Sequence, residues 1–158
     1  MDIDPKKTYS KEDIIELAST GRYLFHGSGQ DLSGLKPQKP KTSYTRDFSK
    51  FKDEPFGVFA TPYPEYAIFM ALNSGSSGRS YVHWDDGVFK YGMSPRMWEN
   101  LKDTAFLYVV DKLEFVKRNS VEYVCENSVK PLLKIVIDKS MMPKKIEAID
   151  DPTQGEVS

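Results

Sequence analysis

The stretch RYLFHGSGQ, residues 22–30, places a histidine, two glycines and a serine directly after an apolar run. A glycine lets the main chain approach a ligand closely, and a histidine at a strand end offers a polar ring beside it. His26 is therefore a candidate binding residue. A motif of three residues discriminates poorly, and the alternative is a strand that ends in a turn with His26 merely capping it.

A second group of candidate residues is basic. From Lys36 to Lys52 the chain is rich in lysine and arginine, with Asp47 as the only acidic residue, and aromatic residues are interleaved. The bases are Lys36, Lys39, Lys41, Arg46, Lys50 and Lys52, and the aromatic residues are Tyr44, Phe48 and Phe51. Such a segment suits an anionic partner, because bases neutralise phosphates and rings stack on nucleobases. The net charge of the whole chain is only -1, so no general polyanion-binding surface is indicated.

Several kinds of site are excluded by residues that the sequence lacks. It contains no GxxxxGK[ST], no GxGxxG opening a helix, no HExxH and no GxSxG, so the common nucleotide-binding and hydrolase folds explain it poorly. Cys125 is the only cysteine, which leaves no disulfide framework and disfavours zinc; no metal is expected. With no signal peptide and no long apolar run, we expect a cytoplasmic protein that does not enter a membrane.

The elements that would position these residues follow from periodicity and capping signals. Ser10 as an N-cap, with Asp13 three residues on, predicts a first helix that Gly21 ends. Asp86-Gly87 predicts a tight hairpin within residues 79–92. The other expected helices cover residues 62–75 and 94–103, and the other expected strands cover 22–26, 57–61, 105–111, 112–117, 121–125 and 132–137.

These elements define the fold class. Helices lie early and in the middle, strands dominate the second half, and neither a repeat nor a regular strand-helix alternation occurs, so we expect an α+β fold with mostly antiparallel pairing. A chain of 158 residues without a linker-like tract fits one domain. We expect this domain to span residues 1–146 and to be followed by an acidic, flexible tail over 147–158.

Three segments together resemble the signature regions of the ADP-ribosyltransferase superfamily. LFHGS (24–28), GVFATPYPEYAIFMA (57–71) and VEYVCENSVKPLLKIVI (121–137) follow the order and strand context of its histidine-tyrosine-glutamate branch. That branch includes diphtheria-toxin-like toxins, poly(ADP-ribose) polymerases and rifampin ADP-ribosyltransferases. The resemblance implies split antiparallel β-sheets with a few short helices and an NAD cleft between the sheets. It spans most of residues 22–137, although matching residues are confined to the motifs.

The resemblance assigns roles to the first motif. His26 falls on the histidine that hydrogen-bonds a ribose hydroxyl of NAD. Gly27 falls on the glycine whose main-chain N–H and C=O hold the nicotinamide carboxamide, which needs one donor and one acceptor. Ser28 falls on the residue that contacts the adenosine ribose.

The second motif supplies aromatic walls around the nicotinamide ring. Val58 stands where the family most often has a tyrosine, with Phe59 beside it, and this is a departure from the pattern. Phe69 matches the aromatic residue of the following helix, and ordinary core packing is its alternative role. Tyr66 matches a position whose hydroxyl often bonds the carboxamide, and Tyr63 is a rival wall.

The third motif supplies a carboxylate. Glu122 falls on the family's catalytic glutamate, which binds the 2′-hydroxyl and faces the positive charge that develops as nicotinamide leaves. Surface exposure is the alternative for a lone glutamate, and Glu114 and Glu126 are competing candidates. Glu122 is favoured over these candidates because it follows the other two motifs in the order that the family shows.

The sequence thus predicts an NAD-dependent mono-ADP-ribosyltransferase with Glu122 and His26 as catalytic residues and NAD as the donor. The expected acceptor is a macromolecule, RNA, DNA or protein, bound through Lys39, Lys41, Tyr44 and Arg46; a small-molecule acceptor stays open. A toxin or defence role, with a neutralising partner protein, fits this class. Two alternatives remain: a non-catalytic module that binds NAD, ADP-ribose or a partner, and an NAD-dependent RNA 2′-phosphotransferase.

Overall fold

The computed structural model describes residues 3–38, 56–73 and 77–152. The described helices are α1 (Lys11–Ser19), α2 (Pro64–Asn73), α3 (Pro95–Glu99) and the short 3-10 helices η2 (Lys112–Glu114) and η3 (Lys139–Met141). The strands are β1 (Tyr23–Ser28), β2 (Val58–Ala60), β3 (Ser80–Asp85), β4 (Val88–Met93), β5 (Thr104–Asp111), β6 (Val116–Lys117), β7 (Tyr123–Cys125), β8 (Leu133–Asp138) and β9 (Ile146–Ala148). The fold is α+β, as expected.

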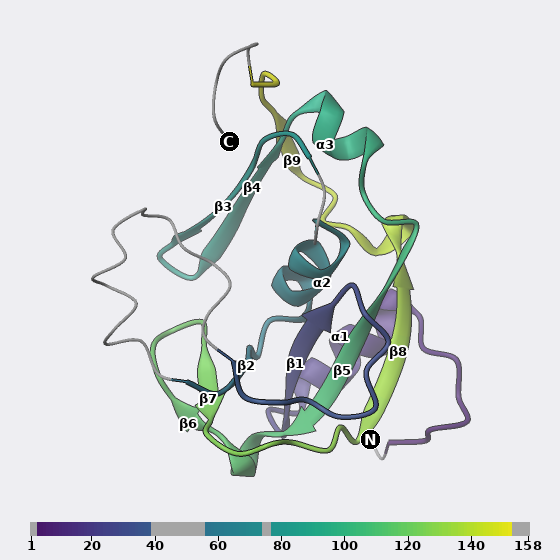
Figure 1. Cartoon of the computed structure of the whole chain (residues 1–158), viewed down its shortest axis with the longest axis vertical. Helices are drawn as coiled ribbons and strands as arrows, with labels where there is room; N and C mark the ends of the chain where they lie inside the picture. Colours follow the sequence, from purple (N-terminus) through teal and green to yellow (C-terminus); the bar gives the residue numbers. More distant parts are fainter. Residues whose placement is uncertain (1–2, 39–55, 74–76, 153–158) are drawn as a thin grey trace.

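The strands form three small sheets, ordered β1-β5-β8, β2-β7-β6 and β3-β4-β9. In Figure 1 the first two sheets occupy the lower part of the molecule, the third lies above them, and α2 lies between. Every pairing within these sheets is antiparallel except that of β4 with β9. Helix α2 therefore packs between the sheets, in contact with β1 and β5.

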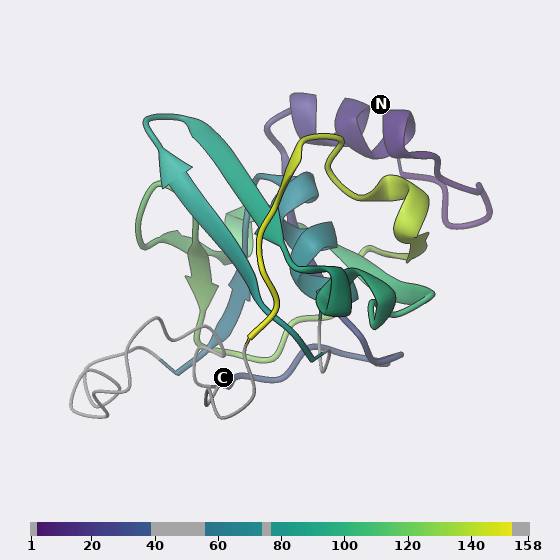
Figure 2. The ribbon, with the colours of Figure 1, turned by 90° about the horizontal axis from the view of Figure 1, so that it is seen from above.

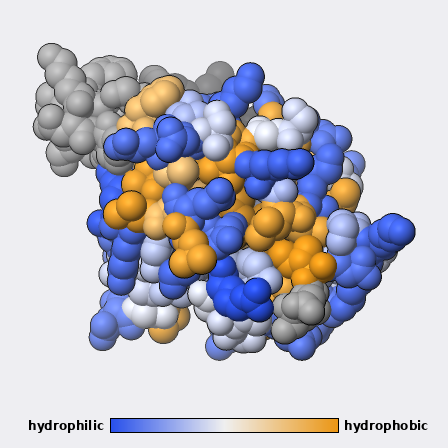
Figure 3. Space-filling view, turned by 90° about the horizontal axis from the view of Figure 1, so that it is seen from below, coloured by the Kyte–Doolittle hydropathy of each residue, from blue (hydrophilic) through white to orange (hydrophobic). Residues whose placement is uncertain are grey.

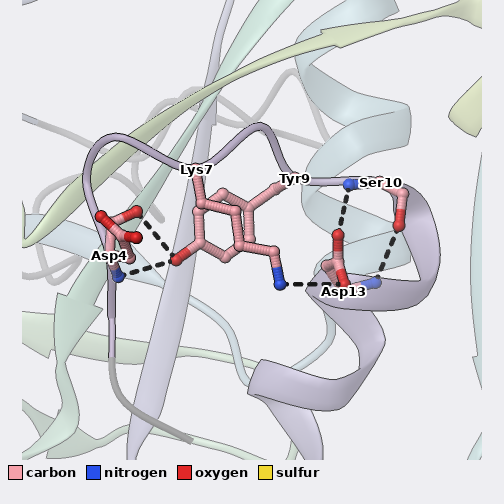
Figure 4. Close-up of polar contacts among 5 residues, drawn as sticks. All are labelled: Asp4, Lys7, Tyr9, Ser10 and Asp13. Atoms are coloured by element: carbon pink, nitrogen blue, oxygen red, sulfur yellow. Dashed lines mark hydrogen bonds and ion pairs between the residues drawn. The ribbon is translucent and has the colours of Figure 1, made fainter.

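Local sequence signals account for several elements. Ser10 caps α1: its hydroxyl accepts from the Asp13 N–H at 3.2 Å, while the Asp13 carboxylate accepts from the Ser10 N–H at 3.0 Å (Figure 4). Just before it, the Tyr9 hydroxyl binds the main chain of Asp4, and Lys7 pairs with Asp13 at 3.3 Å. The entry to α1 is thus closed by reciprocal hydrogen bonds.

The expected hairpin is also present. It joins β3 to β4, and its two turn residues, Asp86 and Gly87, have φ angles of 46° and 90°. Positive φ at both central residues is what a two-residue turn needs to match the twist of its strands. The Asp-Gly dipeptide therefore placed this hairpin correctly.

The end of the described chain differs from expectation. Residues 147–152 were expected in a flexible acidic tail, but β9 pairs in parallel with β4 and runs alongside it (Figures 1 and 2). The Tyr81 hydroxyl donates to the Glu147 carboxylate, and an Asp151 oxygen accepts from the Arg96 N–H at 2.8 Å. Two of the acidic side chains, those of Glu147 and Asp151, are thus engaged in hydrogen bonds that the charge pattern did not reveal.

A second difference concerns residues 112–117, expected as a strand. They form η2 followed by the two-residue β6. Asp111 explains the change, because its carboxylate accepts from the Leu113 N–H at 2.9 Å and caps the 3-10 turn.

Two core clusters hold the sheets together. The larger packs α1 and α2 against one face of the β1-β5-β8 sheet and includes Phe25, Phe69 and Leu107. The smaller lies between the opposite face of that sheet and β2, and includes Leu24, Val58 and Tyr108. Side chains alternate along a strand, so neighbouring residues of β1 enter different clusters.

Candidate functional site

The site lies where β1 and β2 separate. Phe25 of β1 and Thr61, just after β2, exchange two main-chain hydrogen bonds of 2.8 and 2.9 Å. Continuing that antiparallel register would set Gly27 opposite Phe59, but between the described residues of these strands the only bridge is the Phe25–Thr61 pair. Two sheets are thus joined at one point and diverge beyond it.

The histidine of the first motif, His26, connects β1 to β2 beyond the Phe25–Thr61 pair. His26 Nδ1 lies 2.6 Å from the main-chain oxygen of Phe59. A carbonyl only accepts, so Nδ1 carries the hydrogen and donates it, and in a neutral ring the lone pair lies on Nε2. His26 belongs to β1, which continues to Ser28, so it is not the cap of a strand end. Its position relative to β2 is set by a main-chain group.

The main-chain N–H and C=O of Gly27 point toward the edge of β1 that lies next to β2. Because the N–H and C=O of Phe25 point to Thr61, those of Gly27, two residues further on, point the same way. In the ranges that the structure covers, neither group of Gly27 has a hydrogen-bond partner on that side. One donor and one acceptor on adjacent atoms of a strand edge can pair with a carboxamide.

Gly27 has a second reason to be glycine. A Cβ at this position would lie 2.2 Å from the main-chain oxygen of Ala67 in α2 and 3.0 Å from the Ala71 Cβ. Helix α2 therefore approaches β1 as closely as it does only because residue 27 has no side chain.

The glutamate of the third motif lies in the turn between β6 and β7, one residue before β7 rather than within it. Its main-chain oxygen accepts from the N–H groups of Arg118, at 2.9 Å, and Asn119, at 3.2 Å. The Asn119 side-chain oxygen accepts in return from the N–H groups of Val121 and Glu122, at 2.9 and 2.8 Å. These bonds hold Glu122 in a defined turn.

An arginine connects Glu122 to β2. Arg118 Nη1 lies 3.0 Å from Glu122 Oε2, and its guanidinium carbon lies 5.7 Å from the centre of the Phe59 ring. The two charged side chains are only 26% and 23% exposed. Phe59 pairs with Val124 in the β2–β7 ladder, so alternation places Phe59 and Glu122 on the same face of that sheet.

His26 and Glu122, which come from separate segments, are thus linked through Phe59. Phe59 joins them: its carbonyl accepts from His26, and its ring lies under the guanidinium that pairs with Glu122. Sequence reasoning missed Arg118. The only signal for it was a base four residues before Glu122, which is common on protein surfaces.

Two residues of the second motif lie in the core. Phe69, expected as a nicotinamide wall, is 1% exposed, and its ring centre lies 4.8 Å from that of Tyr91. Its alternative role, core packing, is the one observed, because α2 turns this side chain toward the sheets. Val58, at the usual tyrosine position, is 2% exposed in the smaller cluster, on the face of β2 opposite to Phe59. Neither side chain lines the site.

Tyr63 and Tyr66 belong to a half-buried aromatic group that also includes Trp84 and Phe89 of the β3–β4 hairpin. Tyr66 stacks on Phe89 with 5.0 Å between ring centres, and Tyr63 lies 5.1 Å from Trp84 and 5.3 Å from Phe89. Tyr63 also donates its N–H to the Thr61 hydroxyl at 3.2 Å. This group begins two residues after the β1–β2 junction, and the contribution of Phe89 was not predicted.

The remaining predicted residues are placed as follows. Ser28 ends β1 and is half-buried. Glu114 and Glu126, the competing acids, are exposed. Lys39, Lys41, Tyr44 and Arg46 lie outside the described residues, but the two ends of their segment meet, because Gln38 and Gly57 exchange main-chain hydrogen bonds of 2.8 and 3.0 Å.

The side of the molecule near Glu122 exposes apolar surface. Figure 3 views the molecule from below, the side on which η2 and β6 lie in Figure 1, and apolar residues gather over part of it among hydrophilic ones. Leu113 of η2 is 92% exposed and Val116 of β6 is 71% exposed. The Arg118–Glu122 turn follows β6 directly.

Within the described ranges, no three or more side chains of histidine, cysteine, aspartate or glutamate are grouped so that they could hold a metal ion. None of the helices in these ranges has the length and apolar character of a membrane-spanning helix. Cys125 is half-buried against the smaller core cluster.

Comparisons of the chain with protein-family models, with curated proteins and with solved structures found no match.

Proposed function

We propose that this protein is an NAD-dependent mono-ADP-ribosyltransferase. The observation that carries the proposal is that Phe59 links His26 to Glu122 beside the main-chain edge of Gly27. A histidine, an amide-binding edge, an aromatic ring and a carboxylate are the groups that bind and cleave NAD in the family that the three motifs resemble. Here Phe59 links the histidine and the carboxylate beside the point where β1 and β2 separate, which supports the proposal.

Each group has a role in this proposal. Gly27 would pair through its N–H and C=O with the carboxamide of the nicotinamide, and Nε2 of a neutral His26 would accept from a ribose hydroxyl. The proton of Nδ1 is committed to the Phe59 carbonyl, which keeps the ring in that tautomer. Glu122 would accept from the 2′-hydroxyl and stabilise the positive charge that builds on the ribose as the bond to nicotinamide breaks.

The reaction is then a substitution at C1″ of the ribose. The electron pair of the broken bond leaves with nicotinamide, and an oxygen or nitrogen of the acceptor forms the new bond and gives up its proton. Because Glu122 acts mainly on the charge of the transition state, its loss should reduce turnover more than NAD binding.

The test measures nicotinamide release and label transfer from NAD in the presence of a cell lysate. We expect Glu122→Gln to lower both by about 10²- to 10³-fold, the effect of removing one electrostatic stabiliser, while NAD still binds. Glu126→Gln is the matched control, because it neutralises an exposed carboxylate near the same strand. Equal rates for the wild type and Glu122→Gln would refute the proposal.

The acceptor is proposed to be a macromolecule that meets the basic segment. Nuclease-treated and protease-treated arms of the lysate assay separate nucleic acid from protein. If the acceptor is a nucleic acid, removing the charges of Lys39, Lys41 and Arg46 should weaken binding and flatten its salt dependence. An unchanged salt slope would assign the acceptor to another class.

One observation favours a second candidate function, a module that binds NAD or ADP-ribose without cleaving it. The Glu122 carboxylate already has a cationic partner in Arg118. In that case calorimetry would detect NAD binding, and no nicotinamide would be released by the wild type.

A further inference from the structure

The Phe59 ring and the Glu122 carboxylate together hold a planar cation. In the structure this cation is the Arg118 guanidinium, 5.7 Å from the ring centre and 3.0 Å from the carboxylate oxygen. An aromatic face attracts a cation through its quadrupole, and a carboxylate adds direct charge pairing. Both charged side chains are about three-quarters buried, so water screens the pair less than it would on an open surface.

We propose that Arg118 occupies this cation site in the free protein and that the positively charged nicotinamide ring of NAD displaces it on binding. This inference rests on the proposed function and specifies how the same site recognises its substrate. In NAD the ring nitrogen is bonded to ribose, so the ring is flat and carries one positive charge, like a guanidinium. Two cations cannot share one aromatic face and one carboxylate without repulsion.

The exchange also distinguishes substrate from product. When the bond between the ring nitrogen and C1″ breaks, its electron pair stays on the nitrogen and the nicotinamide becomes neutral. A neutral ring loses the attraction to the Glu122 carboxylate and most of its attraction to Phe59. Arg118 keeps its attraction to both the carboxylate and the ring, so it can return to the site. Its main-chain N–H is bonded to the Glu122 main-chain oxygen at 2.9 Å, which keeps Arg118 in the same turn as Glu122. The arginine thus promotes product release.

Competition by Arg118 must lower the apparent affinity for NAD. A site that is available for only a fraction of the time binds its ligand more weakly by that fraction. Removing the guanidinium should therefore tighten NAD binding, whereas a residue that holds the substrate would weaken binding when removed. The two roles predict opposite signs.

The experiment compares NAD with NADH, whose dihydronicotinamide ring is neutral, by calorimetry. We expect Arg118→Gln to tighten NAD binding by about tenfold and to change NADH binding by less than about twofold. Lys117→Gln, which removes the neighbouring exposed cation, should change neither. Weaker NAD binding in Arg118→Gln, or equal tightening of NAD and NADH, would overturn the inference. Arg118→Lys, which keeps the charge but not the plane, is the second variant, and we expect it to lie between the wild type and Arg118→Gln.

A second measurement separates this inference from the proposed function. The probes are 1-methylnicotinamide, a planar cation without ADP-ribose, and neutral nicotinamide, each titrated into Arg118→Gln and followed by NMR. Shifts at Phe59 and Glu122 with 1-methylnicotinamide and not with nicotinamide support the planar-cation site even if no NAD is consumed. Equal shifts with both rings, or none with either while NAD is still cleaved, overturn the inference and leave the proposed function intact.

Discussion

The two sides of β1 differ in what they bury. On the side of α2, Tyr23 and Phe25 are at most 7% exposed, and Gly27 receives the helix main chain. On the other side, Leu24 is fully buried, but His26 follows it and makes a polar contact to β2. Tyr23, Leu24 and Phe25 thus serve stability, His26 presents a polar group to β2, and Gly27 takes part in both, because its Cα faces α2 while its N–H and C=O face β2. If the two sides are energetically separate, substitutions on the helix side should affect stability far more than substitutions on the polar side.

The largest effect is expected at the aromatic residue on the helix side. Phe69→Ala should lower the free energy of unfolding by about 3–5 kcal/mol, because it leaves a cavity beneath Tyr91. Phe59→Ala should cost no more than about 2 kcal/mol, because its ring is only half-buried. Urea denaturation measures both. Equal losses of unfolding free energy in the two variants would show that the two sides form one energetic unit. As a control, Phe69→Leu should retain most of the stability that Phe69→Ala loses.

The next effect concerns the closest contact between β1 and α2. Gly27→Ala should destabilise the protein by about 2–3 kcal/mol, because its Cβ would overlap the Ala67 oxygen and force α2 outward. Gly34→Ala is the matched control, since the nearest atom to its Cβ would be 3.9 Å away. A loss below about 0.5 kcal/mol for Gly27→Ala would show that α2 adjusts freely.

The sequence predicted those features that depend on neighbouring residues. The Ser10 cap and the Asp86-Gly87 hairpin each follow from residues within one turn, and the structure has both. The parallel pairing of β9 with β4 brings together residues that are distant in the chain, such as Glu147 and Tyr81, and periodicity does not encode such contacts.

The candidate site shows the same limit. The histidine and glutamate motifs were found in sequence, but their connection through Phe59 depends on the Phe25–Thr61 bridge and on the β2–β7 register. The role of Phe69 could not be settled because an aromatic residue on an apolar helix face has the same pattern in a core and in a ligand site. Only the packing of α2 decides between them.

A smaller effect is expected on the polar side. A double-mutant cycle with Arg118→Met and Glu122→Gln should give a coupling energy of about 0.5–1 kcal/mol in the free protein, as for a partly exposed ion pair. Thermal or urea unfolding of the four proteins measures it. A coupling energy of zero would mean that the ion pair does not contribute to the stability of the turn.

The smallest effect is expected at α1, which packs on the helix side. The Ser10 N–H and hydroxyl, with Lys7, lower the pKa of Asp13 below its ordinary 3.8. A lowered pKa in the folded state contributes stability above pH 3.8 that is lost as the pH falls through the lowered value. We therefore expect the stability difference between the wild type and Asp13→Asn to shrink in that acidic range, as followed by circular dichroism. A difference that is constant with pH would show that the carboxylate charge has no part in capping.

The hydrogen bonds between Gln38 and Gly57 affect how much the length of the segment between them can change. Because residues 38 and 57 are hydrogen-bonded to each other, the two described ends that flank residues 39–55 are held at one point. The entropic cost of closing a flexible loop rises by only about 0.6 kcal/mol for each doubling of its length. Segments of other lengths and charges could therefore connect residues 38 and 57 while the positions of His26 and Glu122 are preserved.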